Sequence, residues 1–225
     1  GVGLILQVGG ASQYEWLLYG GSIGYTYAGS YTYLKDGDSY NPGDGIVVQG
    51  SASAVGRMSS LDLDLSYKVY TADKIGSEQF FKAGGIASAV LTGKYNFHDG
   101  MLSVTLAEIL RSKNSLQFGD ALRTEDRRSN ANKTILGGSV TYSFIPQWSF
   151  TMLTEYRQLA ANKYEVASEK YFGKSDLFSF GGGIDYRDPG DRFTLTTKLV
   201  LSSGEANKDA VRHPSISISA YELSI

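Results

Sequence analysis

The sequence contains no cysteine, only four prolines and no long apolar run among its 225 residues. Without cysteine, disulfide bonds and thiolate metal sites are excluded. Because no stretch approaches the roughly 18 unbroken apolar residues that a spanning helix needs, membrane proteins built from helices are excluded as well. Membrane proteins built from strands stay possible, since alternating polar and apolar residues dilute the hydropathy signal.

Net charge is also nearly absent, at −2. No basic stripe interleaves with the aromatic residues, so nucleic acid is not an expected partner. The 27 glycines and 16 tyrosines favour twisted strands over helices, because the long runs of Ala, Leu, Glu and Lys that helices use are missing.

Four segments, which begin at Gly20, Gly93, Gly137 and Gly181, repeat one pattern. In each, a run of alternating polarity ends in aromatic residues and passes through a tight polar turn into a second alternating run. Read with a period of two, each segment is a β-hairpin with one apolar and one polar face. Nothing separate in the sequence looks able to cover so many apolar faces, so lipid is the expected cover.

The clearest alternation lies between Leu61 and Tyr70. One face of this strand carries Leu61, Leu63, Leu65, Tyr67 and Val69, and the other carries Asp62, Asp64, Ser66 and Lys68. A charge that faces hydrocarbon costs several kcal/mol at mid-depth in a membrane. The polar face must therefore look into an interior that holds water or partner charges.

Extended to the whole chain, the pattern predicts an all-β fold, a single closed antiparallel up-and-down transmembrane β-barrel made of residues 1–225. Twelve strands are expected, near residues 2–10, 14–27, 31–36, 45–57, 60–70, 79–97, 101–111, 133–145, 148–158, 175–187, 192–203 and 213–225. If residues 14–35 form one long strand and the first run is peripheral, the count falls to ten. An even count is expected in both cases.

The predicted connections alternate in length. Short turns are expected at residues 28–30, 57–60, 98–100, 145–147 and 188–191. Longer polar loops are expected at residues 36–45, 71–78, 112–132, 159–174 and 204–212. Short turns on one rim and long loops on the other are typical of bacterial outer-membrane barrels. Both termini would then lie on the short-turn rim.

Aromatic residues are concentrated beside the predicted short turns. They are Tyr25, Tyr27, Tyr31, Tyr33, Tyr95, Phe97, Tyr142, Phe144, Trp148, Phe150, Tyr186 and Phe193. Amphipathic rings favour the boundary between headgroups and acyl chains, so these residues are predicted to mark one membrane interface. Cross-strand aromatic pairing in a soluble sheet is the alternative.

The last residues alternate too, with Tyr221, Leu223 and Ile225 on one face and Glu222 and Ser224 on the other. In this terminal pattern and in its whole architecture, the chain resembles the bacterial outer-membrane β-barrel superfamily. The resemblance implies a location in the bacterial cell outer membrane, contact with the lipid bilayer and recognition of the last strand by the outer-membrane insertion machinery. It points to no particular family.

The predicted lumen is lined by charged residues on most strands. They are Arg57, Asp62, Asp64, Lys68, Lys94, Glu155, Arg157, Asp185, Arg187 and Lys198. Six cations against four anions indicate a slight preference for anions. We therefore expect a channel or porin for passive passage of small hydrophilic solutes, anionic ones included. The alternative is a non-conducting barrel, closed by ion pairs or by the loop at 112–132, that serves as an anchor, an adhesin or part of an export assembly.

Few residues fit catalytic templates. His98 and Asp99 are adjacent in a short turn, and turn formation explains them better than acid–base chemistry. His213 and Ser215 fall on the same face of a predicted strand, which leaves a membrane-embedded hydrolase as a second alternative. No enzyme activity and no cofactor are predicted.

Two acidic patterns have structural explanations. Asp62 and Asp64 are spaced as the carboxylates of a glycosidase would be, but pairing with lumen cations is the preferred interpretation. The run Asp36-Gly37-Asp38 begins like a calcium-binding loop and lacks its later ligands, so it is read as a turn. No metal site is predicted.

Overall fold

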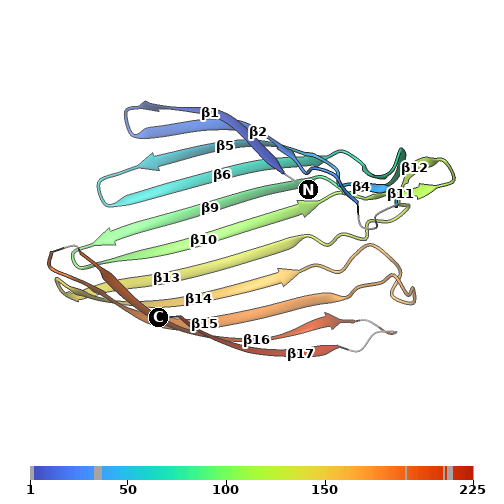
Figure 1. The fold of residues 1–225 in the computed structure, drawn as a ribbon. Helices are drawn as coiled ribbons and strands as arrows, with labels where there is room; N and C mark the ends of the chain where they lie inside the picture. The colour runs from blue at the N-terminus through green and yellow to red at the C-terminus, as the bar shows by residue number, and fades with distance from the viewer. Residues whose placement is uncertain (1–2, 33–36, 191, 210, 212–214, 225) are drawn as a thin grey trace.

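The computed structural model describes residues 3–32, 37–190, 192–209, 211 and 215–224. In this part of the chain, eleven strands form one antiparallel sheet in the order β1-β2-β5-β6-β9-β10-β13-β14-β15-β16-β17. These strands are β1 (Leu4–Tyr14), β2 (Leu17–Tyr27), β5 (Gly45–Val55), β6 (Ser59–Tyr70), β9 (Ile86–Phe97), β10 (Gly100–Arg111), β13 (Lys133–Ile145), β14 (Trp148–Leu159), β15 (Lys174–Arg187), β16 (Thr194–Lys208) and β17 (Ile216–Ser224). The sheet curves into a trough with β1 and β17 along its two borders (Figure 1).

A second sheet of six short strands lies at one end of the trough, as far as the described residues show (Figure 1). Its strands are β3 (Tyr31–Thr32), β4 (Ser39–Asn41), β7 (Asp73–Ile75), β8 (Glu78–Lys82), β11 (Ser115–Phe118) and β12 (Ala121–Thr124). They come from three successive long connections of the large sheet. Each connection forms a hairpin, and the hairpins pair edge to edge through β4 with β7 and β8 with β11.

The prediction of a closed barrel is wrong: the described residues form two open sheets, in which β1 does not pair with β17. Every pairing of neighbours in the large sheet is antiparallel. Since the described strands of this sheet number eleven, an odd count, β1 and β17 run in the same direction. They cannot form the antiparallel pair that would close an up-and-down sheet, and the predicted even count is wrong as well.

The start of β1 and the end of β17 consequently lie toward opposite ends of the trough (Figure 1). Leu4 pairs with Tyr27, next to the long connection that follows β2. Ser224 pairs with Lys198, toward the end where β15 and β16 are joined by a short connection. The expectation that both termini lie on the short-turn rim is therefore wrong.

The strand expected at 31–36 is not part of the large sheet. Its described residues, Tyr31 and Thr32, form β3 of the second sheet, so the count falls from twelve to eleven. The short turn expected at 28–30 is the start of a long connection, and the turn between the first two strands, expected between residues 10 and 14, is made by Glu15 and Trp16. Glu15 has a positive φ of 51°. Glycine or asparagine usually occupies this conformation, so a glutamate gives no sign of a turn in the sequence. The other four predicted short turns coincide with tight connections between neighbouring strands.

The strand expected at 79–97 is divided between the two sheets. β8 ends at Lys82 and β9 begins at Ile86, with Gly84 between them. A Cβ atom at Gly84 would lie 2.2 Å from the main-chain oxygen of Ser112. Glycine is needed here because the connections after β8 and β10 touch backbone to backbone where the two sheets meet.

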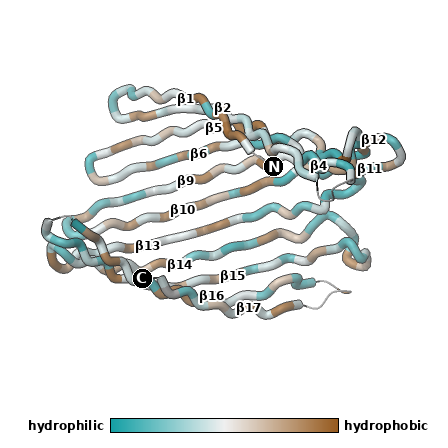
Figure 2. Tube along the Cα trace, in the orientation of Figure 1, coloured by the Kyte–Doolittle hydropathy of each residue, from teal (hydrophilic) through white to brown (hydrophobic). Residues whose placement is uncertain are grey.

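The sheet has almost no interior of its own. Within the described ranges, the buried hydrophobic residues are Ala107 and Tyr171. Large apolar side chains stay exposed on almost every strand of the large sheet, and hydrophobic and hydrophilic residues alternate along the strands (Figure 2). None of the described residues belongs to a helix that is long and apolar enough to cross a membrane. The apolar surface is therefore left for something outside the chain to cover.

Candidate functional site

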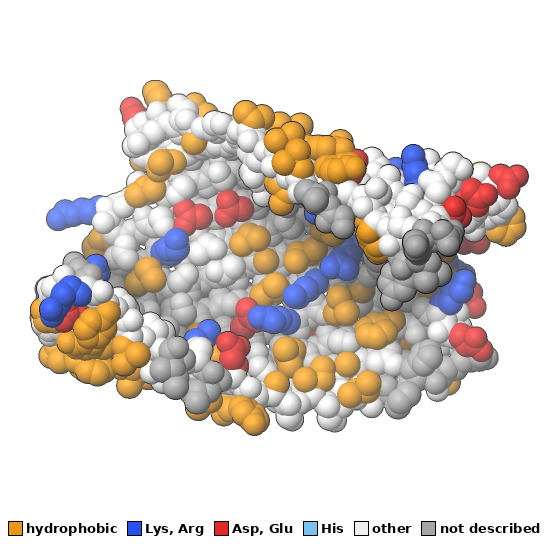
Figure 3. Space-filling model, in the orientation of Figure 1, with side chains coloured by type: hydrophobic (Ala, Val, Ile, Leu, Met, Phe, Trp, Pro, Cys, Tyr) orange, Lys and Arg blue, Asp and Glu red, His pale blue; other side chains and the backbone are white. Residues whose placement is uncertain are grey.

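The large sheet has two unlike faces, which its register defines residue by residue. The "polar face" is the side that carries Asp62, and the "apolar face" is the side that carries Leu63. One row across the polar face consists of Gln13, Leu18, Ser53, Asp62, Thr92, Thr105, Gly137, Glu155, Ser179, Ser202 and Ala220. Figure 3 shows that the trough is hollowed and that acidic and basic side chains lie in the hollow.

The register places eight of the ten charged residues that the sequence assigned to a lumen on this polar face. They are Asp62, Asp64, Lys68, Lys94, Glu155, Arg157, Asp185 and Lys198. Arg187 is the last residue of β15 and lies at the rim. Arg57 belongs to the turn between β5 and β6, so it lies beyond the sheet face and lines nothing.

Hydroxyl groups pair across neighbouring strands of the polar face. The oxygen distances are 2.7 Å for Ser66 and Ser88, 3.2 Å for Thr92 and Thr105, 2.9 Å for Thr141 and Thr151, and 2.8 Å for Ser179 and Ser202. Near β1, the Gln7 amide donates to Ser22 at 3.0 Å and to Gln49 at 3.1 Å. Each hydroxyl keeps spare hydrogen-bonding capacity, so the wall can also bind water or polar solutes.

Two ion pairs lie flat on this wall. Lys94 is 3.2 Å from Asp62, which also accepts a hydrogen bond from Ser53. Glu155 pairs with Arg157 on the same strand. Both pairs join residues of one strand or of adjacent strands, so neither bridges the hollow. Among the described residues, the charges therefore do not close the trough in the way that a filled lumen would require.

Asp64 differs from Asp62 in its surroundings. It is exposed and has no ion pair or hydrogen bond among the described residues. It borders a cavity of about 640 Å³ that is also lined by Ser51, Ser66 and Ser88. The Asp62 carboxylate is held by Lys94 and Ser53, whereas Asp64 faces the cavity, so the two carboxylates have different partners.

Two further basic residues on the polar face escaped the sequence analysis. Lys68 and Arg111 both pair with Ile86, so they lie in one row with β9 between them. Lys133 pairs with Ile109, which lies two positions before Arg111 on β10. Alternation could not reveal them, because the apolar residues Ala107 and Ile109 interrupt the polar face of β10. With Arg157 they make a diagonal line across the sheet, which we call the basic row: Lys68, Arg111, Lys133 and Arg157.

The apolar face carries most of the predicted aromatic girdle at the short-turn end. The eight residues there are Tyr95, Phe97, Tyr142, Phe144, Trp148, Phe150, Tyr186 and Phe193. The rings of Trp148 and Tyr186 are 4.8 Å apart between centroids.

The remaining four predicted members of the girdle do not lie at that end. Tyr25 and Tyr27 lie at the opposite end of β2, and Tyr31 belongs to the second sheet. Tyr33 lies outside the described residues. The turn that joins β1 to β2 brings Tyr14 and Trp16 to the short-turn end in their place.

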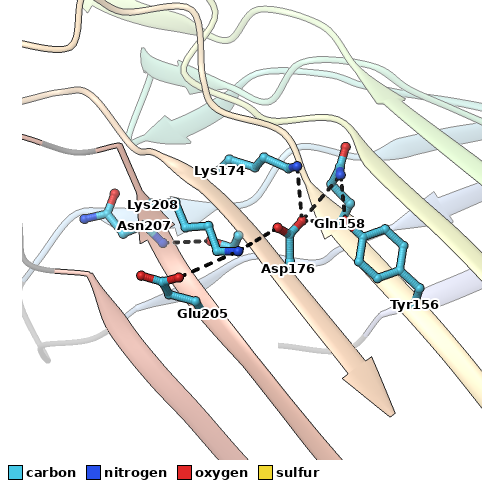
Figure 4. A network of polar contacts seen from close by, with 8 residues as sticks. Tyr156, Gln158, Lys174, Asp176, Glu205, Asn207 and Lys208 are labelled. Atoms are coloured by element: carbon cyan, nitrogen blue, oxygen red, sulfur yellow. Dashed lines mark hydrogen bonds and ion pairs between the residues drawn. The ribbon is translucent and has the colours of Figure 1, made fainter. Parts of the chain in front are cut away.

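A polar cluster marks the other border of the apolar face, near the long connections (Figure 4). The Asp176 carboxylate accepts a hydrogen bond from the Tyr156 hydroxyl at 2.8 Å and lies 3.0 Å from Lys208 and 3.5 Å from Lys174. Burial raises the pKa of Asp176, but the hydrogen bonds from Tyr156 and Lys208 and the charge of Lys174 outweigh it and lower the pKa to about 2. The cluster lies past Phe178, where the apolar residues of β15 end.

We predict that Asp176→Asn lowers the free energy of unfolding by about 1–2 kcal/mol at pH 7, because Lys174 loses its partner and Lys208 keeps only the more distant Glu205. A carboxyl with a lowered pKa stabilises the folded state above its ordinary pKa of 3.8, and this contribution is lost as the pH falls toward about 2. Urea unfolding of both proteins between pH 7 and pH 2 checks this. The two curves should converge at low pH, while Asp120→Asn in an exposed turn should match the parent throughout.

Of the residues suggested for catalysis, the structure describes His98, Asp99 and Ser215. His98 is almost fully exposed in its turn, with Nε2 3.7 Å from Asp99. His213 and Asp36 lie outside the described residues, and Ser215 precedes β17. No group of three acidic or histidine side chains suited to a metal ion is found within the described part of the chain.

Comparison of the chain with protein-family models, curated proteins and solved structures finds no match. The polar and apolar faces of the large sheet are therefore the observations from which a function can be inferred.

Proposed function

We propose that the large sheet is embedded in a bacterial outer membrane and that its polar face lets small hydrophilic solutes pass. The observation that carries the proposal is the separation of the two faces. Large apolar side chains are exposed on one face over nearly all eleven described strands, while hydroxyls, amides and charges line the hollow on the other.

The dimensions of the apolar face suit a lipid bilayer. On β14 it runs from Trp148 to Tyr156, eight residue steps, which is about 27 Å along the strand. Strand tilt shortens this height, and outward apolar bands of transmembrane strands measure about 25 Å. Aromatic rings at one border and the Asp176 cluster at the other suit the two polar boundaries of a membrane.

The open edges favour a second candidate function. Along β1 and β17, the outer backbone groups have no partner strand within the described residues. Lipid cannot satisfy such groups, and each one left unpaired in hydrocarbon costs several kcal/mol. Both edges must therefore be covered by other polypeptide. The protein can accordingly be a wall within a larger assembly and not conduct alone.

Recording of the purified protein in planar bilayers separates the two candidates. The first predicts discrete conductance steps, reduced by Ser88→Trp, which fills the hollow, and unchanged by Ala89→Trp on the apolar face of the same strand. Vesicle flotation confirms insertion of each variant. Inserted protein that gives no conductance at any voltage would contradict the first candidate and favour the second.

A further inference from the structure

The basic row gathers four cations on one diagonal of the polar face. Lys68 and Arg111 occupy one row, two strand spacings or about 10 Å apart. Arg111 and Lys133 are diagonal neighbours, as are Lys133 and Arg157, at about 7–8 Å each. The side chains of neighbours in the row, above all Arg111 and Lys133, are long enough to converge on one small ligand between them. Basic side chains lie together in the hollow, toward the long connections (Figure 3).

The row is short of counter-charges. Glu155 neutralises Arg157. Lys68, Arg111 and Lys133 have no ion pair within the residues that the structure describes, and Lys68 instead lies 4.9 Å from the ring of Tyr70. The nearest carboxylate by sequence, Glu108, belongs to the apolar face, since it pairs with Ala89 and Thr134.

A further guanidinium joins this end of the trough. Arg128 donates to the main-chain oxygen of Arg111 at 3.2 Å. Its Nε atom is buried and has no hydrogen-bond partner in the described part of the chain. Buried donors are normally paired, so a water or a ligand is expected beside this nitrogen.

The donors specify the ligand chemistry. Guanidinium groups form paired hydrogen bonds with carboxylate and phosphate oxygens, and lysine adds a point charge. Arg111 and Lys133, with a further cation on either side of them, suit a compact anion, and the row is too short for a polyanion. The lipid headgroup is a second source of phosphate, but it would have to come from the apolar face, on the other side of the sheet.

We propose that the basic row binds a small phosphate-type oxyanion and makes the polar face favour anionic over cationic solutes. The preference in transport rests on the proposed function, whereas the binding does not. The site is centred on Arg111 and Lys133, neither of which the alternation in the sequence identifies.

The test compares Arg111→Gln/Lys133→Gln with the charge-matched control Arg123→Gln/Lys163→Gln, whose residues lie on β12 and in the connection after β14. Calorimetry with inorganic phosphate in detergent measures binding without any need for transport. We expect the first variant to lose affinity at least about tenfold, since it loses two charge-assisted contacts, and the control to keep the parental affinity. In bilayers, the reversal potential across a KCl gradient should shift toward cations in the first variant alone.

The outcomes separate the site from the proposed function. Phosphate binding without conductance supports the site and contradicts transport. Conductance without phosphate binding by the parent protein, or an equal loss in both variants, overturns the site. Binding to phosphatidylglycerol vesicles should be the same for all three proteins, and a loss confined to the first variant would mean that the row holds lipid phosphate, which also overturns the proposal.

Discussion

Leu106→Arg should prevent insertion of the protein into lipid vesicles. Leu106 is exposed on the apolar face, in a row with Leu63, Leu91 and Leu136. Arginine on the lipid face of a transmembrane strand costs about 2–4 kcal/mol near the middle of a bilayer. That cost corresponds to a loss of roughly 30-fold to 1,000-fold in the equilibrium between inserted and free protein.

The neighbouring residue provides the control. Thr105 points to the polar face, where its hydroxyl pairs with Thr92. Thr105→Arg therefore adds the same side chain to the same strand but places it in the hollow. Flotation with vesicles over a urea series measures insertion of both variants. If they insert equally well, the two faces do not meet different surroundings, and lipid contact on the apolar face is refuted.

Gly84→Ala should lower the free energy of unfolding by about 2–3 kcal/mol, because a methyl group would collide with the backbone. The new Cβ would lie 2.2 Å from the oxygen of Ser112 and 2.7 Å from its carbonyl carbon, and neither atom can move without displacing the connection after β10. The change would separate the second sheet from the large one. Urea unfolding followed by the fluorescence of the two tryptophans measures the loss.

Gly50→Ala is the matched change in the centre of β5. Its Cβ would meet a single atom, the oxygen of Gly20 at 3.9 Å, which is ordinary contact. We expect its stability to stay within about 0.5 kcal/mol of the parent. Equal behaviour of the two alanine variants would show that the connections after β8 and β10 are not packed as described.

The sequence predicts the faces of the large sheet well because side-chain direction along a strand depends only on parity. Asp62 and Leu63 must point to opposite sides wherever the strand lies, and the register then carries each assignment to the neighbouring strands. Arg111 and Lys133 could not be assigned in this way, because the alternation is interrupted beside them. Ala107 and Ile135 interrupt the polar alternation between them and the rest of the face, so parity gave no signal.

Closure could not be predicted, because it depends on whether one short segment joins the large sheet. The run at 31–36 was expected to be a strand of that sheet, but its described residues Tyr31 and Thr32 pair with β4 in the second sheet. Without that strand the large sheet has eleven described strands, so β1 and β17 run in the same direction and the sheet stays open. The strands of the second sheet are too short, at two to five residues, to show any alternation. Their pairing follows from which long connections become neighbours in space.

Spin labelling tests lipid contact on the apolar face most directly. The chain has no cysteine, so single cysteines at positions 101 to 106 of β10 can each carry a label without background. In liposomes, we expect accessibility to oxygen, which dissolves in lipid, to be high at 102, 104 and 106. Accessibility to a water-soluble nickel reagent should be high at 101, 103 and 105. A uniform profile, or the opposite alternation, would contradict lipid contact on the face that carries Leu63.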